Sequence, residues 1–209
     1  MNPLFGLGTS IAMSFDVQRR LRIIAPENLI SLAAWLYTDV QPNIAGLDEL
    51  EKVLRRCWAE ERTLVGNGCN VDFVNDLVLL ENRFGTWARQ VVPQHVFWSV
   101  FQGFRAFLVA TAHAPVLVRP AGYPQALRMT MDQRLDDGGK RVLVNYTYFP
   151  ADWPVDEVKQ AGNGAWQSRD ALRDNRTGAW SGTWRGLELA GYFDVGTGEV
   201  LTYFPIISP

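Results

Sequence analysis

The clearest pattern in this chain is an apolar stripe at helical spacing over residues 27–38. Pro26 suits the first position of a helix, because its missing N–H would have no helical partner there anyway. A polar break at residues 41–43, with the sequence Gln-Pro-Asn, then interrupts the pattern. The stripe consists of Leu29, Leu32, Ala33 and Leu36. We therefore expect a helix over residues 27–38.

A second helix is predicted to begin near Asp48. Its carboxylate can cap the first turn, and Glu51 stands three residues later, which is the capping-box pattern. An apolar face follows at helical spacing, formed by Leu50, Val53, Leu54, Cys57 and Trp58. The opposite face carries charged side chains, namely Glu51, Lys52, Arg55, Arg56 and Glu60. This separation of apolar and charged positions is typical of a surface helix that covers a core.

A third helix is predicted over residues 70–92. Asn70 can begin it and Pro93 can end it. The apolar stripe would consist of Phe73, Leu77, Leu80, Phe84 and Trp87. Residues 96–112 stay ambiguous, because their apolar positions fit helical spacing while their Val and Phe content also suits strands.

Beyond Pro115 the pattern changes to that of strands. Residues 116–118 are expected to form a short strand, and residues 126–133 and 141–148 alternate around a good hairpin turn at residues 136–139. A short helix is predicted over residues 154–160, ending near residues 162–164, where the sequence is Gly-Asn-Gly. A second hairpin is predicted from residues 180–194 and 199–206, joined at residues 195–198.

This order of elements predicts an α+β protein, with a helical N-terminal half followed by a mainly antiparallel β-sheet that includes a short helix. The expected regions are residues 1–114 (helical) and 115–209 (β-rich), with a soft boundary near residues 115–124. One continuous domain across this boundary is the alternative.

Composition narrows the class of protein. The chain has 209 residues, 47% of them hydrophobic, and a net charge of −2, which argues against an obligate nucleic-acid scaffold but leaves room for a ribonuclease with a locally basic groove. No run approaches the roughly twenty apolar residues of a membrane span, so no membrane partner is expected. The N-terminus is a poor signal peptide, because no basic segment precedes its apolar part. The spacing of Cys57 and Cys69 predicts neither a zinc site nor a disulfide framework, so reduced thiols in a cytoplasmic protein are expected, with a single bridge as the alternative.

The closing sixty residues resemble a known family. Phe149-Pro150, Trp153, the helix after it and the final segment over residues 198–205, with the sequence Gly-Glu-Val-Leu-Thr-Tyr-Phe-Pro, are similar to the frame of bacterial EndoU ribonucleases. In that family a Thr and a following Tyr of the final segment help to bind uridine and phosphate. The resemblance assigns the Thr role to Thr202 and places Phe204 at the Tyr position. Tyr203 is shifted by one residue and therefore belongs to the other face of a strand.

The resemblance also implies a catalytic set. EndoU enzymes cleave RNA with two His residues as acid and base and one Lys that stabilises the phosphorane charge, without a cofactor or metal for the proton transfers. The chain has two His residues, His95 and His113, and their order with Lys159 resembles that of the family. The sequence departs from the bacterial pattern after Gly138-Gly139, where Lys140 stands in place of a His.

Arginine and tryptophan alternate in the last third of the chain. Arg with exposed rings can grip phosphate and stack bases, so Trp184 and Arg185 are predicted to contact RNA. The alternative is that the rings belong to the core while the arginines are solvated. The other members of this group are Trp166, Arg169, Arg173, Arg176 and Trp180.

Two functions are compatible with these features. The first is an EndoU-like endoribonuclease that acts on RNA, such as a toxin or effector domain delivered into a target cell. The second is a non-enzymatic binding protein, either an immunity or adaptor protein for a cognate toxin or an inactive EndoU-like relative. The missing His after Gly138-Gly139, Phe204 at the Tyr position and the acidic net charge favour the second.

Overall fold

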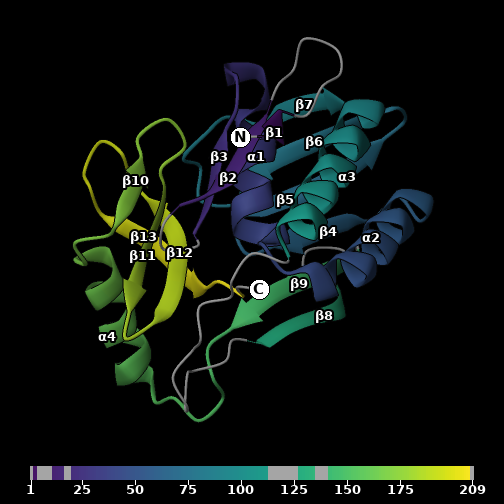
Figure 1. Cartoon of the computed structure of the whole chain (residues 1–209). Helices are drawn as coiled ribbons and strands as arrows, with labels where there is room; N and C mark the ends of the chain where they lie inside the picture. The colour runs from purple at the N-terminus through teal and green to yellow at the C-terminus, as the bar shows by residue number, and fades with distance from the viewer. Residues whose placement is uncertain (1, 4–10, 17–19, 113–126, 135–140, 208–209) are drawn as a thin grey trace.

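The computed structural model describes residues 2–3, 11–16, 20–112, 127–134 and 141–207, in which strands form three sheets (Figure 1). The helical elements are η1 (Glu27–Leu29), α1 (Ile30–Trp35), η2 (Leu36–Val40), α2 (Ile44–Ala59), α3 (Gln94–Thr111) and α4 (Val155–Trp166). The first strands are β1 (Asn2–Pro3), β2 (Ala12–Phe15), β3 (Leu21–Ile24), β4 (Thr63–Gly66), β5 (Cys69–Val74), β6 (Leu77–Asn82) and β7 (Gln90–Pro93). The later strands are β8 (Leu127–Arg134), β9 (Arg141–Tyr148), β10 (Leu172–Asp174), β11 (Ala179–Trp184), β12 (Leu187–Phe193) and β13 (Val200–Pro205).

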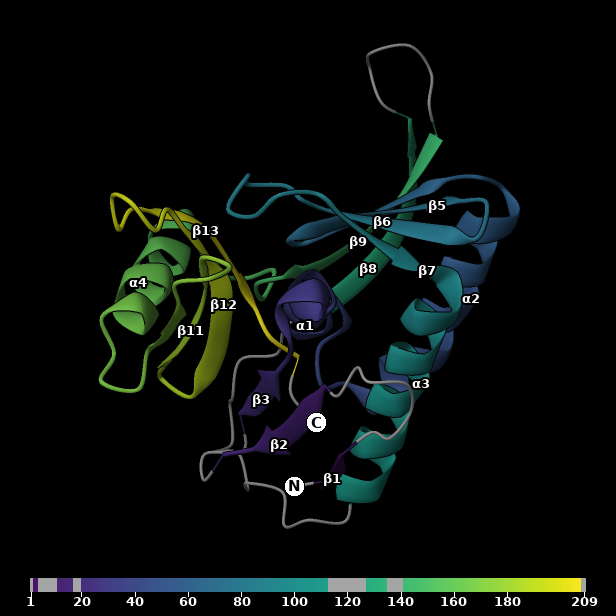
Figure 2. The same cartoon turned by 90° about the horizontal axis from the view of Figure 1, so that it is seen from above.

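The largest sheet has six strands in the order β7-β6-β5-β4-β9-β8. Its neighbouring strands are antiparallel except for β4 and β9, which run parallel. Helices α1, α2 and α3 pack against one face of this sheet, and the core between them is aromatic (Figure 2). Trp35 on α1 lies 4.9 Å from Phe97 on α3, measured between ring centroids, and Phe73 on β5 meets the same ring edge-on. Because β8 and β9 join β4–β7, this one sheet draws on segments from both sides of residue 115.

The prediction of a helical N-terminal half is wrong. Strands β1–β3 precede the first helices and strands β4–β7 follow α2, and residues 70–92, predicted as one helix, form β5, β6 and β7. Buried positions alternate with more exposed ones along β5 and β6, as expected for strands with one face on the core. Asn75 adopts a positive φ of 54° in the tight turn that pairs Val74 with Leu77. The apolar residues fit a period of 3.6 by coincidence. Asn75-Asp76 is a turn signal that indicates a hairpin instead of a continuous helix.

The other helices follow the sequence more closely. Residues 27–38 are helical as predicted, with a 3-10 turn before α1 and a π turn after it. Helix α2 begins at Ile44 rather than at Asp48, so Asp48 lies inside the helix and pairs with Arg105 of α3. The ambiguous residues 96–112 belong to α3, and Pro93 precedes this helix instead of ending an earlier one.

The C-terminal part is a four-stranded antiparallel sheet in the order β10-β11-β12-β13, with α4 across one face. The hairpin of β12 and β13 and the pairing of β8 with β9 confirm two predicted hairpins. Residues 180–194, predicted as one strand, form β11 and β12 around a turn at Arg185 and Gly186, both of which have positive φ. The predicted strand at residues 116–118 and the turn at residues 136–139 lie outside the described residues.

Helix α4 continues to Trp166, past the glycines expected to end it. Gly162 lies against the ring of Tyr203, where an added Cβ would come within 2.5 Å of ring atoms. Gly164 lies still closer to the indole of Trp184. These glycines therefore let the helix approach the sheet closely instead of marking its end.

The opposite face of the C-terminal sheet packs on the rest of the molecule, and Figures 1 and 2 show α4, this sheet and α1 in sequence from one side to the middle. Tyr192 of β12 is fully buried and stacks on Phe84 at 5.7 Å between ring centroids. Its hydroxyl lies 3.4 Å from the Thr38 hydroxyl and 3.8 Å from the Cys69 sulfur. This seam joins elements from both ends of the chain.

Candidate functional site

His95 lies in the first turn of α3 and is exposed. The preceding residue, Gln94, donates its backbone N–H to the Asp76 carbonyl at 2.8 Å, which fixes this turn beside the β5–β6 turn. The C-terminal sheet meets the six-stranded sheet beyond the opposite end of β6, where Phe84 stacks on Tyr192. Since β6 spans roughly 17 Å at about 3.4 Å per residue, His95 and the C-terminal sheet are separated by about that length.

The structure therefore does not bring His95 to Lys159 or Thr202. Figures 1 and 2 agree, because α3 lies on the side of the molecule away from α4 and β13. His113 lies outside the described residues, as does Lys140. Lys159 is an exposed residue of α4.

Trp184 and Arg185 do come together, at the turn between β11 and β12. The Arg185 guanidinium lies 4.4 Å from the centroid of the Trp184 ring, and its Nη1 is 3.8 Å from Glu157 of α4. Trp184 is half-buried against α4 and meets Trp153 at 5.6 Å. The indole is thus mainly a packing group, while Arg185 is 71% exposed along its side chain and reaches solvent.

Thr202 and Phe204 lie on the sheet face opposite Tyr203. Tyr203 packs on α4, as the shift by one residue predicts. Phe204 is only 6% exposed and packs with Ala190, Ile206 and Tyr37 in a small core cluster. The Phe204 ring is therefore not open to a base, and the expected stacking role is corrected to a packing role.

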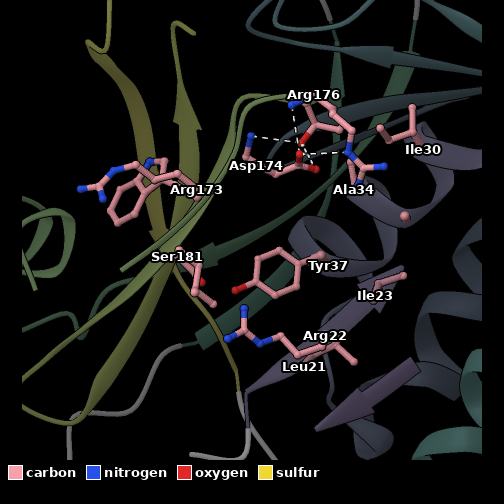
Figure 3. A pocket seen from close by; sticks show the side chains of 15 residues that line it. Leu21, Arg22, Ile23, Ile30, Ala34, Tyr37, Arg173, Asp174, Arg176 and Ser181 are labelled. Atoms are coloured by element: carbon pink, nitrogen blue, oxygen red, sulfur yellow. Dashed lines mark hydrogen bonds and ion pairs between the residues drawn. The ribbon is translucent and has the colours of Figure 1, made fainter. Parts of the chain in front are cut away.

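A cavity of about 230 Å³ lies where β3 and α1 face β10 and β11 (Figure 3). Most of its wall is apolar, formed by Leu21, Ile23, Ile30, Ala33, Ala34, Leu172 and Ala179. Its polar side chains include Arg22, Tyr37, Asp174, Arg176, Thr177 and Ser181. Arg173 also lines it, but its guanidinium stacks on Trp166 at 3.9 Å from the ring centroid and so points to the α4 side. Apolar walls with a few polar groups are typical of small-ligand sites.

The hydroxyls of Tyr37 and Ser181 meet at one side of the cavity (Figure 3). Tyr37 donates its hydroxyl to Oε1 of Glu188 at 3.2 Å, and Ser181 forms a hydrogen bond with Tyr37. Burial, followed by the nearby Glu188 charge, raises the pKa of Tyr37 well above its ordinary value of 10.0. Tyr37 therefore stays protonated, and its hydroxyl donates away from the cavity to Glu188.

Glu188 lies behind Tyr37 and is 8% exposed. Burial raises the pKa of its carboxyl to about 7, against the lowering effects of the Tyr37 hydroxyl and the Arg20 guanidinium. Asp16 and Asp170 raise it further, and both pair with Arg20 at 3.1 Å. A carboxyl that changes charge near neutral pH thus stands one hydrogen bond away from the cavity.

A second buried polar group lies at the seam. The Asp39 carboxylate accepts hydrogen bonds from the Thr38 hydroxyl at 2.6 Å and the Gly68 N–H at 3.1 Å. Burial raises the pKa of Asp39 and of Cys69 beside it. Both cysteines are free and buried, so Cys57 and Cys69 are not bridged. Because these side chains face the interior, we interpret the group as structural.

The hydrogen-bonded pair of Tyr37 and Glu188 beside the cavity was not predicted from the sequence. Glu188 stands between Leu187 and Leu189 in an otherwise apolar strand, and a lone carboxylate in such a position was the available signal. Tyr37 gave no signal of its own, since a tyrosine at the end of an amphipathic helix is ordinary core material. Their contact joins positions 151 residues apart, so only the fold reveals it.

Other kinds of site are less evident in the ranges that the structure describes. There, no three His, Cys, Asp or Glu side chains gather as metal ligands. None of the helices among those residues is long and apolar enough to cross a membrane. Comparisons with protein-family models, with curated proteins and with solved structures give no match for this chain.

Proposed function

We propose that this chain is a non-enzymatic binding protein that holds a small, largely apolar ligand between α1 and the C-terminal sheet. The observation that supports this most is the 230 Å³ cavity, whose apolar walls end in a few hydroxyl and guanidinium groups and the Asp174 carboxylate. Its volume exceeds the cavity of about 150 Å³ that binds benzene and falls below the roughly 300 Å³ at which drug-sized pockets begin. A ligand with one ring and one polar group fits this range.

The EndoU-like nuclease is the weaker proposal on this geometry. The base must lie within hydrogen-bond reach of the 2′-hydroxyl and the acid within reach of the leaving oxygen, so both must lie beside the same scissile phosphate. The length of β6 separates His95 from the strand that carries Thr202, and Phe204 is buried. A likeness to the EndoU frame in the last sixty residues remains a proposal about ancestry, compatible with an inactive relative that binds.

The test is to fill the cavity from opposite walls. Ala34 of α1 is 6% exposed, and Ala179 lines the cavity from β11 of the C-terminal sheet. We expect the wild-type protein to bind benzyl alcohol, measured by ligand-observed NMR, because the apolar walls release water on binding. The variants Ala34→Phe and Ala179→Phe should each reduce that binding at least about tenfold, which corresponds to about 1.4 kcal/mol.

The matched control is Val155→Phe on α4. Val155 is 68% exposed and lies outside the cavity, so this variant should bind benzyl alcohol like the wild type. Circular dichroism would show that each variant keeps the fold. Binding that persists in both cavity variants, or that is absent from the wild type, would contradict the proposed function.

A further inference from the structure

We propose that the ligand of the cavity is a small monocarboxylate whose binding takes up one proton, with Glu188 as the proton acceptor. The inference rests on the proposed function and adds the chemical class of the ligand and its dependence on pH. It follows from a series of polar groups that leads from the cavity into the interior. Ser181 and Tyr37 line the cavity, Glu188 accepts a hydrogen bond from Tyr37, and Arg20 lies near Glu188.

An anionic group is indicated by the donors at this side of the cavity. The Tyr37 and Ser181 hydroxyls can donate, and Figure 3 shows Arg22 on the same side of the view as both of them. Arg22 uses Nη2 to reach Asp16 at 3.2 Å, and its side chain is 38% exposed. A carboxylate is a small anion that a planar guanidinium and two hydroxyls can satisfy together, and it can carry an apolar ring or chain. The apolar wall of α1, with Ile30, would then hold the ring or alkyl part.

Ionised Glu188 opposes this arrangement in two ways. Its carboxylate accepts the Tyr37 hydroxyl proton, so that O–H points inward rather than to the cavity. Its negative charge also repels a second carboxylate held on the other side of the Tyr37 oxygen. An anion therefore binds best after Glu188 has gained a proton.

Protonation reverses the hydrogen bond between the two side chains. Neutral Glu188 donates its O–H to the Tyr37 oxygen, and the Tyr37 O–H then turns to donate to the ligand carboxylate. One proton passes from solvent to Glu188 for each carboxylate bound, so the charge in this region is unchanged by binding. The only covalent bond that forms in the protein is the O–H bond of Glu188, and its proton comes from hydronium or buffer acid in the solvent.

The surroundings of Glu188 determine the pH at which this occurs. Asp16 and Asp170 face it with negative charge, and Arg20 faces it with positive charge while pairing with both. On β11, Thr183 is its cross-strand neighbour and donates to Asp170 at 2.5 Å, which leaves Glu188 without that hydroxyl. Burial is the main cause that raises the pKa of the Glu188 carboxyl to about 7, ahead of these neighbouring charges, so the exchange falls within the physiological range.

The experiment compares benzoate with benzyl alcohol, which has the same ring without the charge, by calorimetric titration at pH 6 and pH 8. Benzoate is ionised at both values, so only the protein changes its charge. For a group that titrates near pH 7, benzoate should bind about tenfold more tightly at pH 6, while benzyl alcohol binds equally at both. Titration of benzoate in buffers with different ionisation heats should show uptake of about one proton at pH 8.

Two variants and a control complete the design. Glu188→Gln keeps a hydrogen-bond partner for Tyr37 but cannot ionise, so its benzoate affinity should match the low-pH wild type at both values. Tyr37→Phe should weaken benzoate at pH 6 while leaving benzyl alcohol unchanged. Glu157→Gln removes a carboxylate of α4 away from the cavity and should keep the wild-type pH dependence.

The outcomes separate the inference from the proposed function. Benzoate binding that is equal at both pH values, or no proton uptake, would overturn the inference even while benzyl alcohol still binds and is blocked by Ala34→Phe. The inference would also be overturned if Glu157→Gln abolished the pH dependence of benzoate binding while Glu188→Gln retained it. If neither ligand binds the wild-type protein, the proposed function fails together with the inference.

Discussion

At the scale of single residues, the unusual feature is an acid placed where a strand is otherwise apolar. Glu188 is 8% exposed, and none of the nearby ion pairs among the described residues includes its carboxylate. Arg20 lowers its pKa but is shared with Asp16 and Asp170. Retaining such a group weakens the fold at neutral pH, so we interpret it as a feature kept for binding rather than for stability.

Glu188→Gln should change how stability depends on pH. The folded-state pKa of about 7 exceeds the ordinary value of 4.5, so the unfolded chain ionises first as pH rises. Stability from this group is full below about pH 4.5 and is lost progressively up to about pH 7, by roughly 3 kcal/mol in total. Urea unfolding between pH 4.5 and 8 should show this decline in the wild type and a flatter profile in the variant. Parallel profiles would contradict the role assigned to Glu188.

At the scale of elements, close approach between α4 and the C-terminal sheet explains two departures from the sequence-based expectations. The glycines at positions 162 and 164 indicate a helix end by propensity, yet they lie against Tyr203 and Trp184. Packing of the helix on two aromatic rings outweighs a propensity cost of about 1 kcal/mol for each glycine. Because Trp184 packs against Gly164 of α4, its indole stabilises the contact between the helix and the sheet.

Gly162→Ala should therefore destabilise the protein although alanine favours helices. The new Cβ would stand 2.5 Å from the Tyr203 ring, and separating helix from sheet costs about 1–3 kcal/mol, more than the propensity gain. Asn163→Ala changes the next, exposed residue of α4 and should be neutral or slightly stabilising. Thermal unfolding of both variants tests this. A gain in stability for Gly162→Ala would show that α4 does not sit this close to the sheet.

At the scale of the whole molecule, the main feature is the seam between the C-terminal sheet and the N-terminal elements. Tyr37, Thr38 and Phe84 reach across to β12, and the cavity lies in the same seam. His95 lies outside this region, at the far end of β6. The arrangement favours a ligand held at the seam over chemistry that joins His95 to the last strand.

Incubation with labelled uridine-containing RNA tests this at the level of activity. We expect no cleavage above a buffer control for the intact protein, and the same for His95→Ala, because His95 is too far from Thr202 to act with it. Denaturing gel electrophoresis of the RNA gives the measurement. Cleavage by the intact protein that is lost in His95→Ala would restore the nuclease proposal.

The sequence by itself determined the elements whose signals are local. The amphipathic stripe of residues 27–38, the charged and apolar faces of α2, and the pairing of β8 with β9 follow from periodicity and turn residues that act within a few positions. Residues 70–92 show the limit, because their apolar positions satisfy helical spacing and strand alternation at once. These residues form strands because β5 pairs with β4 and because α2 and α3 pack against the face of the sheet.

Tertiary structure alone decided the site. The cavity needs walls from residues 21–37 and 172–181, and the hydrogen bond from Tyr37 to Glu188 spans 151 positions. A raised pKa depends on how many atoms exclude water around a carboxyl, a quantity that no local pattern encodes. Burial of Phe204 and the distance of His95 from it arise in the same way, from how distant segments pack.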